Sequence, residues 1–190
     1  FVDMTDKPTH IVHIGDHWDM PSLSSYDKGK KSFEGRKYIK DIEAGNIAMQ
    51  AFDKIIDEYY DAHPEETPPE RHIFLGNHEE RIMRVINDNR EFDGLIGYHQ
   101  FALEKWNVHD FKQVHVIGDI AFSHYFCQGA LGKPASSARA MLNNQHMSCV
   151  QGHIQKLDIA FGKNAAQKQI IGLMCGTFYQ HDEGYLGPQG

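Results

Sequence analysis

Cysteine is scarce in this chain: Cys127, Cys149 and Cys175 are the three that occur among 190 residues, and no two form a CxxC pair. This usage predicts neither a disulfide framework nor a thiolate zinc site, and it favours a reducing cytoplasm. Long apolar runs are also lacking, since none approaches the roughly 20 residues that span a bilayer. The opening residues, FVDMTDKP, lack the basic and then apolar order of a secretory signal. We therefore expect no membrane partner.

Positive charge is in deficit, with 19 Lys and Arg against 26 Asp and Glu and a formal net charge of −7. This balance argues against nonspecific coating of nucleic acid, because backbone affinity comes from Lys and Arg. A metal-centred site that handles phosphate stays compatible with it, because bound cations invert the local field. The length predicts one domain, residues 1–190, with a substantial core. Histidine is the abundant residue, with 13 copies, and only its spacing can single out the functional ones.

Short β-branched runs that end on glycine alternate with segments of helical periodicity. This order predicts a layered α/β domain with its polar clusters at strand ends, where open α/β sheets place their sites. In the first long helix, the apolar positions 48, 52, 55, 56, 59 and 60 predict the face turned to the core. We expect strands at 9–15, 71–75, 147–153, 156–162 and 168–178, a hairpin at 113–124, and helices at 41–60, 77–89, 92–106 and 135–145.

Four of these strand ends carry the same kind of residue: GDHWD (15–19), GNHE (76–79), FSH (122–124) and QGHIQ (151–155). Any one of them alone is weak, because a single histidine at a strand end is usually structural. Together they offer carboxylate, amide and imidazole ligands without a thiolate, which is the donor set of a hard-cation site.

The four motifs resemble the calcineurin-like metallophosphoesterase superfamily, whose signature is D-x-H, G-D-x-x-D, G-N-H-[DE], a lone His and G-H-x-H. The resemblance runs from Gly15 to about Thr177, and FLGNHEERI (74–82) is especially similar to phosphoesterases of phages and prophages. It implies a fold of two β-sheets packed as a sandwich and flanked by helices, in four layers, with two divalent metal ions at the strand ends. It also implies a hydrolase that cleaves phosphoric esters, located in the host cytoplasm if the gene is carried by a phage.

By this resemblance, Asp16 bridges the two ions, and Asn77, His124 and His153 hold the second of them. Such a pair can bind phosphate and lower the pKa of a shared water. Gln155 stands where the family has the second His of G-H-x-H, and its neutral carbonyl suits Mg²⁺ or Mn²⁺ better than softer metals. We expect Mn²⁺, with Mg²⁺, Zn²⁺, Fe or Ni²⁺ as alternatives.

The resemblance makes His78 and Asp19 the catalytic pair. His78 would face the leaving group, and Asp19 would orient it and favour its charged form, because a nearby opposite charge raises an imidazole pKa. His17 is a candidate for substrate contact, with an exposed turn residue as the alternative. Arg81 and its neighbour Arg84, one helical turn apart, either bind a phosphate oxygen or solvate the helix face. The loop at 28–37, rich in Gly and Lys, either steers phosphate or is a solvated connection.

In the family, D-x-H lies on a strand before G-D-x-x-D, and the fourteen residues before Gly15 do not contain it. Two explanations stay open: the sequence lacks its natural N-terminus, or the protein is a degenerate member with one metal or none. The first leads to a phosphatase or phosphodiesterase, with nucleic acid as one substrate class. The second leads to a binding scaffold that keeps the fold without turnover. The oligomeric state and the substrate stay open as well.

Overall fold

The computed structural model describes residues 7–25 and 29–177 and has a mixed α/β architecture. Three parallel strands form the first sheet, in the order β1-β2-β3. They are β1 (His10–His13), β2 (Glu70–Phe74) and β3 (Asn107–His109). The carboxyl ends of β1 and β2 lie together, because His13 is paired with Ile73. The predicted α/β class is confirmed.

A second sheet of five strands has the order β4-β5-β8-β10-β9. Its centre is parallel, and both edge strands, β4 and β9, pair antiparallel with their neighbours. The strands are β4 (His115–Ile117), β5 (Ile120–Ser123), β8 (Ser148–Gln151), β9 (Leu157–Lys163) and β10 (Gln169–Cys175). A separate two-stranded hairpin consists of β6 (Cys127–Gln128) and β7 (Lys133–Pro134).

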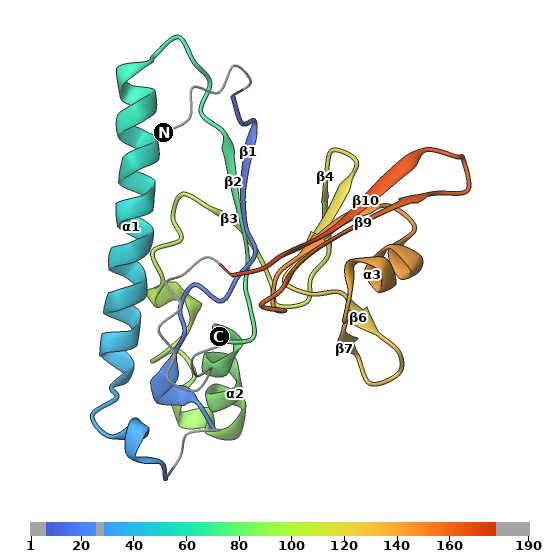
Figure 1. Cartoon of the computed structure of the whole chain (residues 1–190). Helices are drawn as coiled ribbons and strands as arrows, with labels where there is room; N and C mark the ends of the chain where they lie inside the picture. The colour runs from blue at the N-terminus through green and yellow to red at the C-terminus, as the bar shows by residue number, and fades with distance from the viewer. Residues whose placement is uncertain (1–6, 26–28, 178–190) are drawn as a thin grey trace.

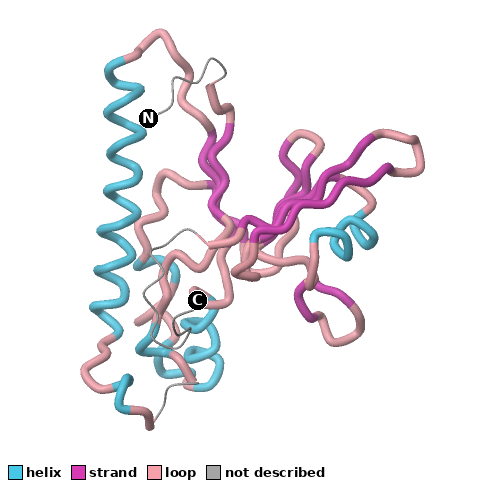
Figure 2. The backbone as a smooth tube through the Cα atoms, in the orientation of Figure 1, coloured by secondary structure: helices cyan, strands magenta, loops and turns pink. Residues whose placement is uncertain are grey.

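Helices flank the two sheets on different sides (Figures 1 and 2). The long α1 (Tyr38–Ala62) runs alongside the three-stranded sheet, and α2 (Glu80–Asp88) follows β2 after a short turn. The short α3 (Ala138–Gln145) packs on the five-stranded sheet through β9 and β10. Its N-terminus is capped by Ser137, whose hydroxyl accepts the Ala140 N–H. Among the described residues, none of the helices has the length and apolarity needed to cross a membrane.

Two hydrophobic cores follow from this arrangement. One lies between α3 and the five-stranded sheet, with Met141, Leu142 and Met174 at its centre. The other contains Trp18, whose ring stacks on Phe101 with the centroids 4.2 Å apart. Because Trp18 belongs to the loop after β1, this second core anchors the polar residues beside it.

Several sequence predictions were wrong or incomplete. Residues 92–106 do not form a helix but short 3₁₀ turns at Arg90–Phe92 and Tyr98–Gln100, because Gly94 and Gly97 adopt positive φ angles of 79° and 157°. The strands β3, β6 and β7 were not predicted.

The predicted inner face of the first long helix was also wrong in part. Four of the predicted positions are exposed, namely Ala48, Phe52, Ile55 and Tyr59. The buried stripe contains Ile42, Gly45, Met49, Asp53 and Ile56. The remaining predicted strands and helices are present, with ends that differ by a few residues. The opening residues 1–6, Lys28 of the basic loop and Phe178 of the last predicted strand lie outside the described residues.

Candidate metal centre and catalytic pair

The loop after β1 turns sharply through two residues in the left-handed region, Gly15 (φ 91°) and Asp16 (φ 57°). Such a φ is unfavourable for Asp, so the neighbouring structure must stabilise it. The stabilising partner is Glu79, which accepts the N–H groups of Asp16 (3.0 Å) and Trp18 (2.9 Å). This turn presents the Asp16 carboxylate to the ends of the neighbouring strands.

Glu79 was missed by the sequence reasoning as a functional residue. It is fully buried and also accepts the N–H of Gly76 at 2.7 Å, so it joins the loops after β1 and β2. Burial, followed by the charge of Asp16, raises the pKa of Glu79 to about 7. The available signal was the acidic fourth position of the GNHE motif, to which no role had been given.

Two glycines allow the loops to approach. A Cβ on Gly76 would lie 2.1 Å from Asp16 Oδ1 and 2.8 Å from His124 Cε1. A Cβ on Gly15 would lie 2.4 Å from the carbonyl oxygen of Phe74. All three distances are shorter than real Cβ contacts, so only glycine lets these polar side chains come together.

The structure brings four predicted ligands into one cluster, each from a different strand end. One ligand atom each of Asp16, His124 and His153 lies within 4.8 Å of the other two. The Asn77 side-chain oxygen lies between the two imidazoles, 3.1 Å from His124 Nε2 and 2.7 Å from His153 Nδ1. His124 Nε2 is also 3.5 Å from Asp16 Oδ2. Burial lowers the pKa of both histidines, which favours their neutral, ligating form.

The hydrogen bonds of His124 indicate that the four clustered side chains suit a cation. Its Nδ1–H donates to the carbonyl oxygen of Ile14 at 2.6 Å, so the neutral ring carries its lone pair on Nε2. That lone pair faces the oxygens of Asn77 and Asp16, which are acceptors too. Turning the Asn77 amide would satisfy one of these contacts, but the contact with Asp16 would remain acceptor to acceptor. A divalent cation among these atoms removes the conflict, and a backbone carbonyl that orients a ligating histidine is common around metals.

His78 and Asp19, the predicted catalytic pair, are in contact beside this cluster. His78 Nδ1 is 2.7 Å from Asp19 Oδ1, and this hydrogen bond is the main cause that lowers the pKa of Asp19. The backbone N–H of His78 donates to Asp16 Oδ1 at 3.1 Å. The imidazole is therefore fixed relative to the cluster through its own backbone and through a carboxylate.

Arg81 and Arg84 reach back from α2 to the loops of the site. Arg81 Nη1 donates to the carbonyl oxygen of Asp19 at 2.7 Å, and Arg84 Nη2 donates to that of Asn77 at 2.7 Å. Both arginines line a cavity of about 230 Å³, together with Asn77, Tyr125 and His153. The cavity therefore has cationic groups and candidate metal ligands in the same wall, a combination that suits an anion.

Two predicted residues stand apart from the cluster. His17 Nε2 is 2.9 Å from the carbonyl oxygen of Gly45 in α1, so this ring is held by the helix. Gln155 is exposed in the bend that follows His153, and within the described residues no hydrogen bond joins it to the other candidate ligands.

Comparison of the chain with models of protein families, with curated proteins and with solved structures gave no match.

Proposed function

We propose that this protein is a metal-dependent phosphoester hydrolase of the calcineurin-like metallophosphoesterase type. The observation that carries the proposal is the convergence of Asp16, Asn77, His124 and His153 in one cluster beside the His78–Asp19 pair. The finer architecture, a four-layer sandwich of two sheets, is part of the same proposal. So is the cytoplasmic setting, for which the three free cysteines are supporting evidence.

The four clustered side chains would hold one divalent ion, with Mn²⁺ as the first choice for this mixed set of oxygen and imidazole donors. When bound, such an ion acts as a Lewis acid toward phosphate and lowers the pKa of a coordinated water. A second ion belongs to the family pattern, and the residues that would hold it are Asp16, Gln155 and a D-x-H pair, which the fourteen residues before Gly15 do not contain.

The chain's own residues account for substrate binding and proton transfer. Arg81 and Arg84 each have N–H groups beyond those that their backbone contacts use, and these can bind the non-bridging oxygens of a phosphate in the cavity. His78, oriented by Asp19, is the group that can donate a proton to the leaving oxygen. These roles fit monoesters and diesters equally, and a nucleic-acid phosphodiester is the alternative substrate class.

The test is hydrolysis of 4-nitrophenyl phosphate and bis(4-nitrophenyl) phosphate by the purified chain, with added Mn²⁺ and with EDTA. We expect Mn²⁺-dependent cleavage that Asp16→Asn abolishes together with Mn²⁺ binding at this cluster. The exposed Asp88 provides a matched control, because Asp88→Asn removes an equal charge from the end of α2 and should leave both properties unchanged.

Two results would decide against the proposal. An absence of EDTA-sensitive cleavage of either ester would favour the catalytically silent scaffold. Unchanged Mn²⁺ binding in Asp16→Asn would show that this carboxylate supports the turn rather than an ion.

A further inference from the structure

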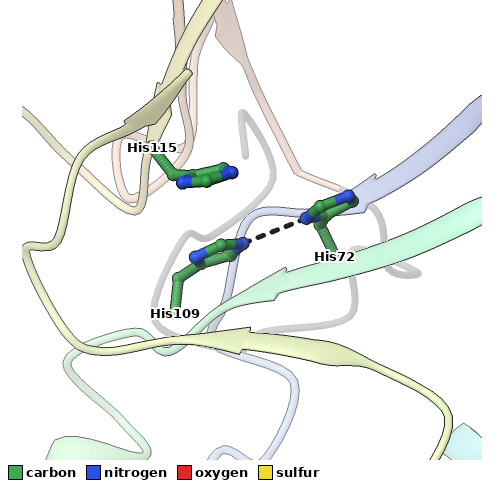
Figure 3. Close-up of side chains that lie close together, drawn as sticks. All are labelled: His72, His109 and His115. Carbon is green, nitrogen blue, oxygen red and sulfur yellow. Dashed lines mark hydrogen bonds between the residues drawn. The ribbon is translucent and has the colours of Figure 1, made fainter. Parts of the chain in front are cut away.

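A second group of histidines lies away from the candidate metal centre, where the two sheets meet (Figure 3). His72 is on β2 and His109 on β3, in the three-stranded sheet, whereas His115 is on β4, in the five-stranded sheet. One ring nitrogen of each lies within 4.8 Å of the other two. His72 and His109 are buried and His115 is half-buried. Three imidazoles from two sheets thus share one small volume.

The protonation state of His109 and its distance from His72 both suit a metal ion. Burial, followed by the neighbouring rings of His115 and His72, lowers the pKa of His109 to about 4, so His109 is neutral at pH 7. His72 Nδ1 and His109 Nε2 lie 3.0 Å apart and share a hydrogen bond. Two nitrogens that each lie about 2.0–2.1 Å from a tetrahedral ion are roughly 3.3 Å apart, so this spacing is already close to that of two ligands.

The other nitrogen of His72 supplies an independent observation. Among residues 7–25 and 29–177, none is a hydrogen-bond partner of the buried His72 Nε2, which lies 3.4 Å from Glu70 Oε2. If Nδ1 faces an ion, Nε2 carries the proton and Glu70 is its nearest acceptor. A carboxylate behind a ligating histidine fixes the tautomer and raises the basicity of the ligand. In a metal-bound state, His72 Nε2–H would therefore donate to the Glu70 carboxylate.

We propose that His72, His109 and His115 form a second metal site, for an ion that prefers imidazole, such as Zn²⁺ or Ni²⁺, with Glu70 as the acceptor that orients His72. The His115 ring stacks on His109 with the centroids 4.4 Å apart, and it must turn to direct a nitrogen at the ion. Its partial exposure leaves room for that turn. An ion held there links β2 and β3 to β4 and thus ties the two sheets together.

A competing placement uses the opposite side of the His72 ring. His10, Glu70 and His72 also have ligand atoms within 4.8 Å of one another. We favour the inner group because His10 and Glu70 are exposed side chains, with His10 Nε2 and Glu70 Oε2 4.0 Å apart, whereas the inner group is desolvated. This alternative supplies a matched control, since His10→Ala removes an imidazole next to His72 without touching the proposed site.

The experiment is a calorimetric titration with Zn²⁺ and with Ni²⁺ of the full chain that carries Asp16→Asn and His153→Ala, which removes the first centre. We expect one bound equivalent, a loss of affinity of at least tenfold on adding His115→Ala, and a 10- to 100-fold loss on adding Glu70→Gln. His10→Ala should leave the affinity unchanged. The Co²⁺ form should show visible absorption typical of a tetrahedral site with nitrogen ligands, and His115→Ala should remove it.

Three results would overturn the inference: no bound equivalent, equal affinities with and without His115, or a loss caused by His10→Ala alone. If the doubly substituted background does not fold, the same variants are compared in the otherwise unaltered chain, where His115→Ala should remove one of the bound equivalents. The outcome is independent of the proposed hydrolase activity, because none of these three histidines belongs to the candidate metal centre.

Discussion

Glu79 gives the sharpest prediction, because a single buried carboxyl accepts three backbone N–H groups, those of Asp16, Trp18 and Gly76. In Glu79→Ala these donors lose their acceptor, and each buried unsatisfied donor costs about 1–3 kcal/mol. We therefore expect the free energy of unfolding to fall by about 3 kcal/mol or more. Urea unfolding monitored by tryptophan fluorescence and circular dichroism measures it. The exposed Glu43, in α1, is the control, and Glu43→Ala should change stability little.

The pH dependence of Glu79→Gln tests the same reasoning without removing the side chain. The pKa of Glu79 is raised from 4.5 to about 7, so the folded state holds the proton more tightly than the unfolded state does. The stability that this group contributes is complete below pH 4.5 and is lost as the pH rises through 7, by up to about 3 kcal/mol. Gln does not titrate, so wild-type stability minus that of Glu79→Gln should fall between pH 5 and 8 when both are measured in EDTA.

Two results would refute this account of Glu79. A difference between wild type and Glu79→Gln that is constant with pH would mean that Glu79 titrates as an ordinary carboxyl. A Glu79→Ala variant as stable as Glu43→Ala would mean that its three hydrogen bonds do not hold the loops together.

Three further predictions concern the site and the histidines. His78→Ala should keep its metal content and lose roughly two to four orders of magnitude in rate, with the largest loss on esters with poor leaving groups. Asp19→Asn should show a milder form of the same defect. An emptied metal site in either variant would contradict the assignment. Gly76→Ala would place a methyl group 2.1 Å from a carboxylate oxygen of the metal-site aspartate, so metal affinity should fall, while Gly162→Ala, whose nearest contact would be 3.6 Å, should bind metal like wild type. The pKa of His109 is about 4 in the folded protein and 6.5 in the unfolded chain. The stability that neutral His109 contributes is therefore complete above pH 6.5 and is lost as the pH falls toward 4. Urea unfolding midpoints measured in EDTA should show that His109→Gln is less sensitive to acid than wild type over this range.

The pattern of apolar residues predicted most of the strands and helices, because this pattern is a property of consecutive residues. The β-branched run before Gly15, the strand before Gly76 and the periodic segment after it appear as β1, β2 and α2. The clustering of the strand-end motifs also followed from the sequence, because neighbouring parallel strands bring their carboxyl ends to one edge of a sheet. The contact of His78 with Asp19 is one example, at 2.7 Å across 59 positions of the chain.

Other features depended on residues distant in sequence. The apolar positions of α1 occur on more than one face, and the packing of Trp18 against Gly45 decides which face is buried, because a Cβ at Gly45 would lie 2.0 Å from the Trp18 ring. The helix predicted at 92–106 failed because its glycines take positive φ angles, and the chain there supplies Phe101 to the core around Trp18 instead. The periodicity of apolar residues alone therefore predicts neither the buried face of α1 nor the structure of residues 92–106.

The sequence by itself determined which residue types stand at the strand ends, since each motif lies within a few consecutive positions. Only the tertiary structure decided that Glu79 is a buried acceptor for two loops, and that His72, His109 and His115 meet between two sheets. The physical reason is the same in both cases. Burial and mutual approach set the pKa and the hydrogen-bond partners of a side chain, and both are properties of the packed chain rather than of the neighbouring residues in the sequence.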